Sequence, residues 1–130
     1  GKGVIKNEAE AVKWYRKAAE QGHAAAQCIF GLALMNGQGV AKNKVEAVKW
    51  FRKSAEQGIA LAQRNLGVAL SHGKGVAKDK IEAAKWFRKA AEQGHANGQC
   101  NLGMVLANGL GVTKNEVEAV NWNRKAAEQG

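Results

Sequence analysis

The sequence predicts an all-α solenoid that is built from 36-residue helical hairpins and contains about seven helices. The phrase AVKWYRKAAEQG at residues 11–22 returns in similar form at 47–58, 83–94 and 119–130. The tryptophans keep the same step of 36 residues, at Trp14, Trp50, Trp86 and Trp122. A fixed period of about 20 to 50 residues is typical of repeat architectures, in which each unit buries its apolar face against its neighbours.

The second helix of each repeat, here termed helix B, has clear start and stop signals. A short polar residue is followed three positions later by glutamate, in the pairs Asn7/Glu10, Asn43/Glu46, Asp79/Glu82 and Asn115/Glu118. This pattern predicts a capping box, in which each of the two side chains accepts a hydrogen bond from a free backbone N–H group. Apolar residues then recur at helical spacing, and a Gln-Gly pair such as Gln57-Gly58 predicts the end of the helix.

The first helix of each repeat, helix A, is predicted at residues 23–36, 59–72 and 95–108. A G-x-G-V loop joins it to helix B. The chain is therefore one array, with a partial repeat at 1–22 and full repeats at 23–58, 59–94 and 95–130. We expect Trp50 and Trp86 to be main packing residues, and Gly31, Gly67 and Gly103 to mark close approaches of two helices.

A helix B of the form AVKWFRKAAEQG after a G-x-G-V loop resembles the Sel1-like repeat (SLR), a relative of the tetratricopeptide repeat. The match extends over essentially the whole chain. The resemblance implies a right-handed superhelix of antiparallel helix pairs that serves as a bacterial scaffold or adaptor for protein–protein interaction. The chain departs from the family where its usual proline is Ala41, Ala77 or Thr113, and it lacks the cysteine pairs of the disulfide-rich branch.

Comparison of the repeats with one another divides helix A into two faces. Columns such as Gln27/Gln63/Gln99 stay fixed, as packing requires, whereas the changing columns gather on the opposite face at about 100° per residue. The resemblance implies that these first helices line a concave surface. We therefore predict a groove for a peptide or protein surface, unless these columns changed only because nothing touches them. Its residues are Ala25, Cys28, Ile29, Leu32, Asn36, Leu61, Arg64, Asn65, Val68, His72, Asn97, Cys100, Asn101, Met104 and Asn108.

The formal net charge of +9 favours acidic partners. Basic residues form three periodic ladders, at Lys6/Lys42/Lys78/Lys114, Arg16/Arg52/Arg88/Arg124 and Lys17/Lys53/Lys89/Lys125. One interpretation is an electrostatic track for nucleic acid or an anionic membrane surface, which is the alternative function. The other, which we favour, is a solvated face whose counter-charges are Glu20, Glu56, Glu92 and Glu128. Exposed aromatic rings for base stacking are not predicted, so nucleic acid is the less favoured partner.

No catalytic or metal-binding pattern stands out in the sequence, so we predict a non-enzymatic protein without a cofactor. His23 and His95 occupy the same column two repeats apart, as do Cys28 and Cys100. A disulfide requires Cα atoms within about 7 Å, so the two cysteines are predicted to be free thiols. No H-E-x-x-H or C-x-x-C motif and no long apolar run is present.

Both ends of the sequence fall within the repeat pattern. It opens in mid-pattern on Gly1 and ends in register on E-Q-G, which is typical of a piece of a longer array. Asn123 replaces the aromatic residue of the other copies, either as a polar cap of the last helix or through drift at a cut end. In either case, we expect weak self-association through the end repeats.

Overall fold

The computed structural model describes the backbone of residues 2–129 and the side chains of residues 7–129. Within this range the chain forms helices joined by turns, which confirms the predicted all-α fold. Their bounds are α1 (Lys2–Glu20), α2 (Ala24–Asn36), α3 (Lys44–Glu56), α4 (Ala60–His72), α5 (Lys80–Glu92), α6 (Ala96–Asn108) and α7 (Glu116–Glu128). The even-numbered helices are the A helices and the odd-numbered ones are the B helices.

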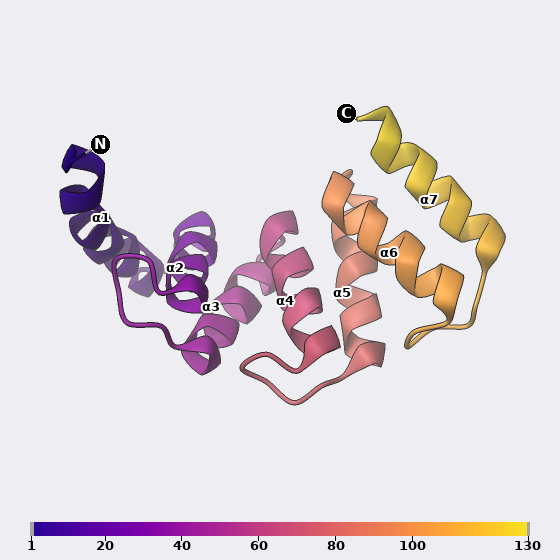
Figure 1. Ribbon diagram of the computed structural model, residues 1–130, viewed down its shortest axis with the longest axis horizontal. Helices are drawn as coiled ribbons and strands as arrows, with labels where there is room; N and C mark the ends of the chain where they lie inside the picture. Colours follow the sequence, from indigo (N-terminus) through magenta and orange to yellow (C-terminus); the bar gives the residue numbers. More distant parts are fainter. Residues whose placement is uncertain (1, 130) are drawn as a thin grey trace.

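The helices follow one another in a single curved array, with the two termini at its opposite ends (Figure 1). Each A helix packs against the B helix that follows it and against the one that precedes it. The hydrophobic core therefore runs through the array from Val12 to Ala119 as one continuous cluster. This is the solenoid arrangement that the 36-residue period predicts, because no hairpin could bury its apolar face alone.

The core is centred on the phenylalanines that follow the tryptophans. Phe51 and Phe87 are each only 1% exposed. A Cβ atom at Gly31 would lie 2.8 Å from the Phe51 ring, and one at Gly67 would lie 2.6 Å from the Phe87 ring. The predicted close approaches at these glycines are thus confirmed, since each accommodates an aromatic ring of the next helix.

The tryptophans are less buried than the sequence suggests. Trp86 is 8% exposed, Trp50 is half-buried, and Trp14 is 64% exposed. The expectation that the two mid-array tryptophans are main packing residues is confirmed for Trp86. It holds only in part for Trp50, which packs against the core while partly exposed, its ring edge-on to Phe30 at 5.6 Å. The phenylalanine column points into the hairpin.

One half of the predicted capping box forms. The Oδ1 atoms of Asn43, Asp79 and Asn115 each accept a hydrogen bond of 3.0 Å from the backbone N–H three residues later. The reciprocal half is wrong. The Oε2 atoms of the three glutamates accept from an indole Nε1 four residues later, at 3.0–3.2 Å, in the pairs Glu46/Trp50, Glu82/Trp86 and Glu118/Trp122. Residues four apart share a helix face, so the indole competes with the backbone for the carboxylate.

The first repeat also differs at its start, because α1 begins at Lys2 and Asn7 lies inside it. Asn7 is therefore not the N-cap that the sequence predicts. In later repeats the loop before helix B is fixed by a hydrogen bond from the N-cap backbone N–H to the preceding A helix, as from Asn43 to the carbonyl of Leu34 (2.8 Å).

Buried glutamines join successive repeats. Gln63 is 4% exposed, and its Nε2 donates to the carbonyl of Ala55 in α3 at 3.1 Å. Its Oε1 accepts from Nε2 of Gln93, at the end of α5, at 2.8 Å. The same pair of bonds recurs at Gln27 and at Gln99. These bonds explain why the glutamine column stays fixed, because a buried amide without partners would be costly.

Candidate partner-binding surface

The A helices lie on the inner side of the array. Helix α4 packs directly against α6. The B helices on the other side are joined across a wider gap by long side chains, since Arg52 of α3 reaches Glu82 of α5 and Arg88 of α5 reaches Glu118 of α7. An array whose elements approach closely on one side and spread on the other curves toward the close side.

Fourteen of the fifteen predicted groove residues are at least partly accessible to solvent. Three apolar side chains are notable for their exposure, namely Ile29 (39%), Leu61 (39%) and Met104 (46%). Leu32 and Val68 are half-buried against the core. We term this surface the A-face: Ala25, Ile29, Leu32, Asn36, Leu61, Arg64, Asn65, Val68, His72, Asn97, Cys100, Asn101, Met104 and Asn108.

Cys28 is the exception and does not belong to the surface. It is 2% exposed, whereas Cys100 in the same column is exposed. Burial raises the pKa of the Cys28 thiol to about 11. The prediction that Cys28 contacts a partner is therefore wrong. The depth of this column therefore differs between repeats: Cys28 is buried, Cys100 is exposed, and the long side chain of Arg64 reaches across to the next repeat.

The two cysteines are expected to differ sharply in reactivity toward a thiol reagent such as dithionitrobenzoate. Cys100 should react at once in the folded protein, and Cys28 only when the array opens, because a buried neutral thiol is a poor nucleophile. Counting the thiols that react in buffer and in denaturant checks this. Two fast thiols in buffer would show that Cys28 is accessible.

Hydrogen bonds link polar residues of the A-face to one another, both within a repeat and between successive repeats. Arg64 Nε donates to Asn101 Oδ1 at 3.0 Å, and Arg64 Nη1 donates to Asn65 Oδ1 at 3.4 Å.

Nearby, His95 caps α6 by accepting from the backbone N–H of Gly98 at 3.0 Å. Burial, and then the charge of Arg64, lower the pKa of His95. The neutral imidazole that the cap requires is thus the favoured form.

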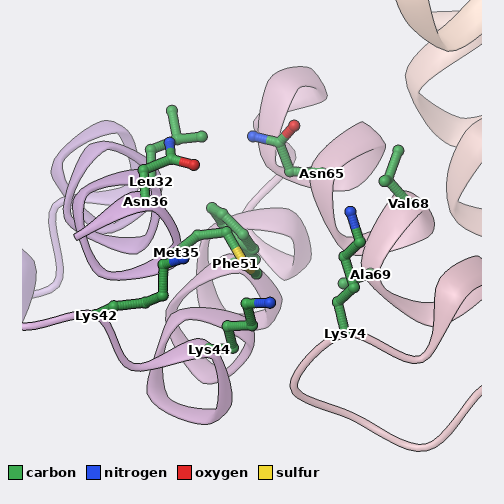
Figure 2. A pocket seen from close by; sticks show the side chains of 10 residues that line it. All are labelled: Leu32, Met35, Asn36, Lys42, Lys44, Phe51, Asn65, Val68, Ala69 and Lys74. Carbon is green, nitrogen blue, oxygen red and sulfur yellow. The ribbon is translucent and has the colours of Figure 1, made fainter. Parts of the chain in front are cut away.

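A pocket of about 290 Å³ opens between α2, the start of α3 and α4 (Figure 2). Four of the predicted groove residues line it: Leu32, Asn36, Asn65 and Val68. The sequence comparison missed the others, Met35, Lys42, Lys44, Phe51, Ala69 and Lys74, as groove residues. The signal was present at position 74, because Gln38, Lys74 and Leu110 form one column of changing chemistry. This column lies in the loop that follows helix A.

The basic ladders of the B helices are engaged in contacts within the protein. The ammonium groups of Lys17, Lys53, Lys89 and Lys125 lie 4.5–5.0 Å from the centres of the four tryptophan rings. Arg52 pairs with Glu82 at 2.7 Å and Arg88 with Glu118 at 2.8 Å. The hydrogen bond from Arg52 lowers the pKa of Glu82, as that from Arg88 lowers the pKa of Glu118.

Part of the predicted pattern of counter-charges is wrong. Arg16 does pair with Glu20, at 3.4 Å. Arg52 and Arg88, however, pair with the glutamate near the start of the next B helix, because the guanidinium bridges the gap between repeats. In the loop ladder, Lys42 and Lys78 are exposed, Lys114 pairs with Glu116 at 3.2 Å, and the side chain of Lys6 lies outside the described residues.

No group of three or more potential metal ligands forms among the described side chains. His72 lies at the end of α4, whereas His23 and His95 are the N-cap residues of α2 and α6. None of the described helices is both long and apolar enough to cross a membrane.

Comparisons with known proteins agree on one family. The model of the Sel1 repeat matches residues 1–23, 24–59, 60–95 and 96–130. No curated protein matches the chain. Among solved structures, a protective antigen present in uropathogenic Escherichia coli strains, which displays an SLR fold, is 48% identical with a TM-score of 0.90. A Sel1 repeat protein from Oxalobacter formigenes is 42% identical, also with a TM-score of 0.90.

The coverage of these structures differs. The E. coli antigen covers 94% of this chain, which spans only 26% of the antigen, and the O. formigenes protein covers 96%, with 50% of its own length matched. Cysteine rich protein B of Helicobacter pylori is 31% identical with a TM-score of 0.74, covering 98% of this chain and 91% of that one. The chain thus spans a quarter to a half of its two more similar neighbours.

Proposed function

The chain belongs to the Sel1 repeat family, and we propose that it binds a peptide or an exposed segment of a partner protein along its A-face. Sel1 repeat proteins are generally scaffolds for protein interaction, and the family is generally non-enzymatic. The proposal adds which face of this chain makes the contact. Solenoids commonly bind through the extended concave surface that their curvature creates.

The observation that carries the proposal is the exposure of apolar side chains on the inner side of the array. Ile29, Leu61 and Met104 come from three successive A helices and are each 39–46% exposed. They lie among hydrogen-bonding groups such as Arg64 and Asn101. Apolar contacts surrounded by polar groups are the usual composition of a protein-binding surface. Methionine, with its flexible side chain, adapts to varied partners.

The basic side chains provide less support for the alternative, a purely electrostatic binder. Lysines stacked on tryptophan and arginines paired with glutamate have part of their charge compensated within the protein. The net charge of +9 still favours an acidic partner over a basic one. An acidic peptide on the A-face is compatible with both the charge and the exposed apolar residues.

The test is a peptide-library selection on the chain, at about 0.05 M and about 0.5 M salt. The A-face variant is Leu61→Asp with Met104→Asp. The matched control is Ile81→Asp with Val117→Asp, which adds the same charge to side chains that are 61% and 75% exposed on B helices. We expect selected peptides to bind the A-face variant at least about tenfold more weakly and the control normally, because apolar contacts at an interface are lost on charging.

Two outcomes would overturn the proposal. Loss of binding in the control variant alone would move the site to the B helices. Binding that both variants retain and high salt abolishes would assign it to the basic ladders, because contacts between exposed charges are screened by salt.

A further inference from the structure

We propose that the pocket between α2 and α4 is a subsite for a carboxylate that a partner peptide carries next to an apolar side chain. The inference rests on the proposed function, since it assigns the chemistry of one part of the A-face. The pocket volume of about 290 Å³ lies at the lower end for ligand sites, which are generally about 300–1,000 Å³. It therefore suits one side chain with an adjoining acidic group.

The pocket wall combines apolar surface with positive charge. Leu32, Met35, Phe51, Val68 and Ala69 supply the apolar part. Three lysines complete the lining, and no acidic residue is part of it: Lys42, Lys44 and Lys74. None of the three makes an ion pair within the part of the chain that the structure describes. An apolar pocket bordered by uncompensated ammonium groups is complementary to an apolar group that carries a negative charge.

A buried donor in the same pocket adds a second, independent indication. The Nδ2 atom of Asn65 is buried and has no hydrogen-bond acceptor among the described residues. Figure 2 shows this nitrogen directed toward the side of the pocket where Leu32 and Asn36 lie. Arg64 donates to Oδ1 of the same amide, which keeps the nitrogen turned away from Arg64. A buried donor without an acceptor is costly, and a ligand oxygen that reaches this nitrogen through a small shift of the surrounding side chains would remove that cost.

The next pair of repeats lacks this combination, although the fold repeats there. At the position of Asn65 one repeat later, Asn101 accepts from Arg64. At the position of Lys74, the chain has Leu110. Cys28, the counterpart of Arg64 one repeat earlier, is buried and is no substitute for a guanidinium. The unpaired amide and the third lysine therefore distinguish the first pair of repeats from the second.

The test is an NMR titration of the isotope-labelled chain with three small probes. N-acetyl-leucine carries a terminal carboxylate beside an apolar side chain, N-acetyl-aspartyl-leucinamide carries a side-chain carboxylate, and N-acetyl-leucinamide is neutral. The signals followed are the Asn65 side-chain amide and the Met35 methyl, which is one of only two methionine methyls. Probes of this size bind roughly in the millimolar range, which such titrations cover.

We expect saturable shifts of both signals with the carboxylate probes, and binding of the neutral probe about tenfold weaker or less. Whichever carboxylate probe binds more tightly identifies a chain terminus or an acidic side chain as the source. Equal binding of the neutral probe would overturn the proposal, since the pocket would then be merely apolar.

Substitutions of residues that line the pocket test whether the carboxylate probes bind there. Lys74→Leu introduces the residue that the chain already has at 110, and it should weaken the carboxylate probes about threefold to tenfold. Asn65→Leu, followed at the Met35 methyl, should weaken them similarly. Lys78→Leu removes the same charge at the next pair of repeats and should change nothing. An equal loss of probe binding in Lys78→Leu would show that lysines attract the carboxylates in general. It would contradict a specific subsite in this pocket.

Failure of the subsite and failure of the proposed function are distinguishable. Selected peptides that need Leu61 and Met104 but bind Lys74→Leu normally would retain the A-face and refute the subsite. If the probes bind this pocket but the chain captures no peptide on the A-face, the subsite is retained and the proposed function is refuted.

Discussion

Phe87→Ala is expected to lower the free energy of unfolding by about 3–5 kcal/mol. The side chain is 1% exposed, and its ring packs against Gly67 of the preceding helix. Truncation removes the apolar contacts of the whole ring and leaves a cavity that the glycine has no side chain to fill. Urea unfolding followed by circular dichroism measures the effect, with the data fitted to a model of coupled repeats rather than to a two-state transition.

Two further variants serve as controls for this prediction. Phe87→Leu keeps most of the volume and should cost about 1–2 kcal/mol, which remains measurable if the alanine variant fails to fold. Trp50→Ala removes a larger side chain but should cost less than Phe87→Ala, because Trp50 is only half-buried. If Trp50→Ala proved the more destabilising, the tryptophan column would be the main packing column after all.

The repeat period accounts for how much of the fold the sequence could predict. Each helix is specified several times over by its cap, its apolar spacing and its terminal glycine, so the bounds of α2 to α7 agree with the expected ranges within a residue or two. The capping box forms only in part, because its motif does not show that the N-cap N–H donates to the preceding A helix or that the glutamate accepts from an indole four residues later. The copy at Asn7 does not cap a helix, because α1 already begins at Lys2 and runs through this position.

The site was less predictable for a different physical reason. Comparing columns shows where side chains vary but not how deep they lie, so Cys28 was placed beside Arg64 although one is buried and the other reaches across the surface. The pocket is formed jointly by α2, α4 and the segment that leads into α3. Lysines 42, 44 and 74 meet there only because the superhelix brings these segments together, and no motif within one repeat encodes such a meeting.

The largest expected effect outside the phenylalanine column is at the second glycine of the G-x-G-V loop. Gly75 has φ +73°, and a Cβ atom there would collide with the backbone carbonyl of Lys44 in the preceding B helix. Gly75→Ala should therefore cost about 3 kcal/mol or more, through a strained backbone and a displaced loop. The measurement is again urea unfolding.

Gly58 is the matched control for this loop contact. It also has positive φ, at +96°, but a Cβ atom there would meet nothing within 4 Å. Gly58→Ala should therefore show only the backbone strain, about 1 kcal/mol or slightly more. The difference in unfolding free energy between the two variants measures the contribution of the contact between each loop and the previous repeat. Equal losses would mean that both glycines serve only for their positive φ and that the loop contact does not hold the repeats in register.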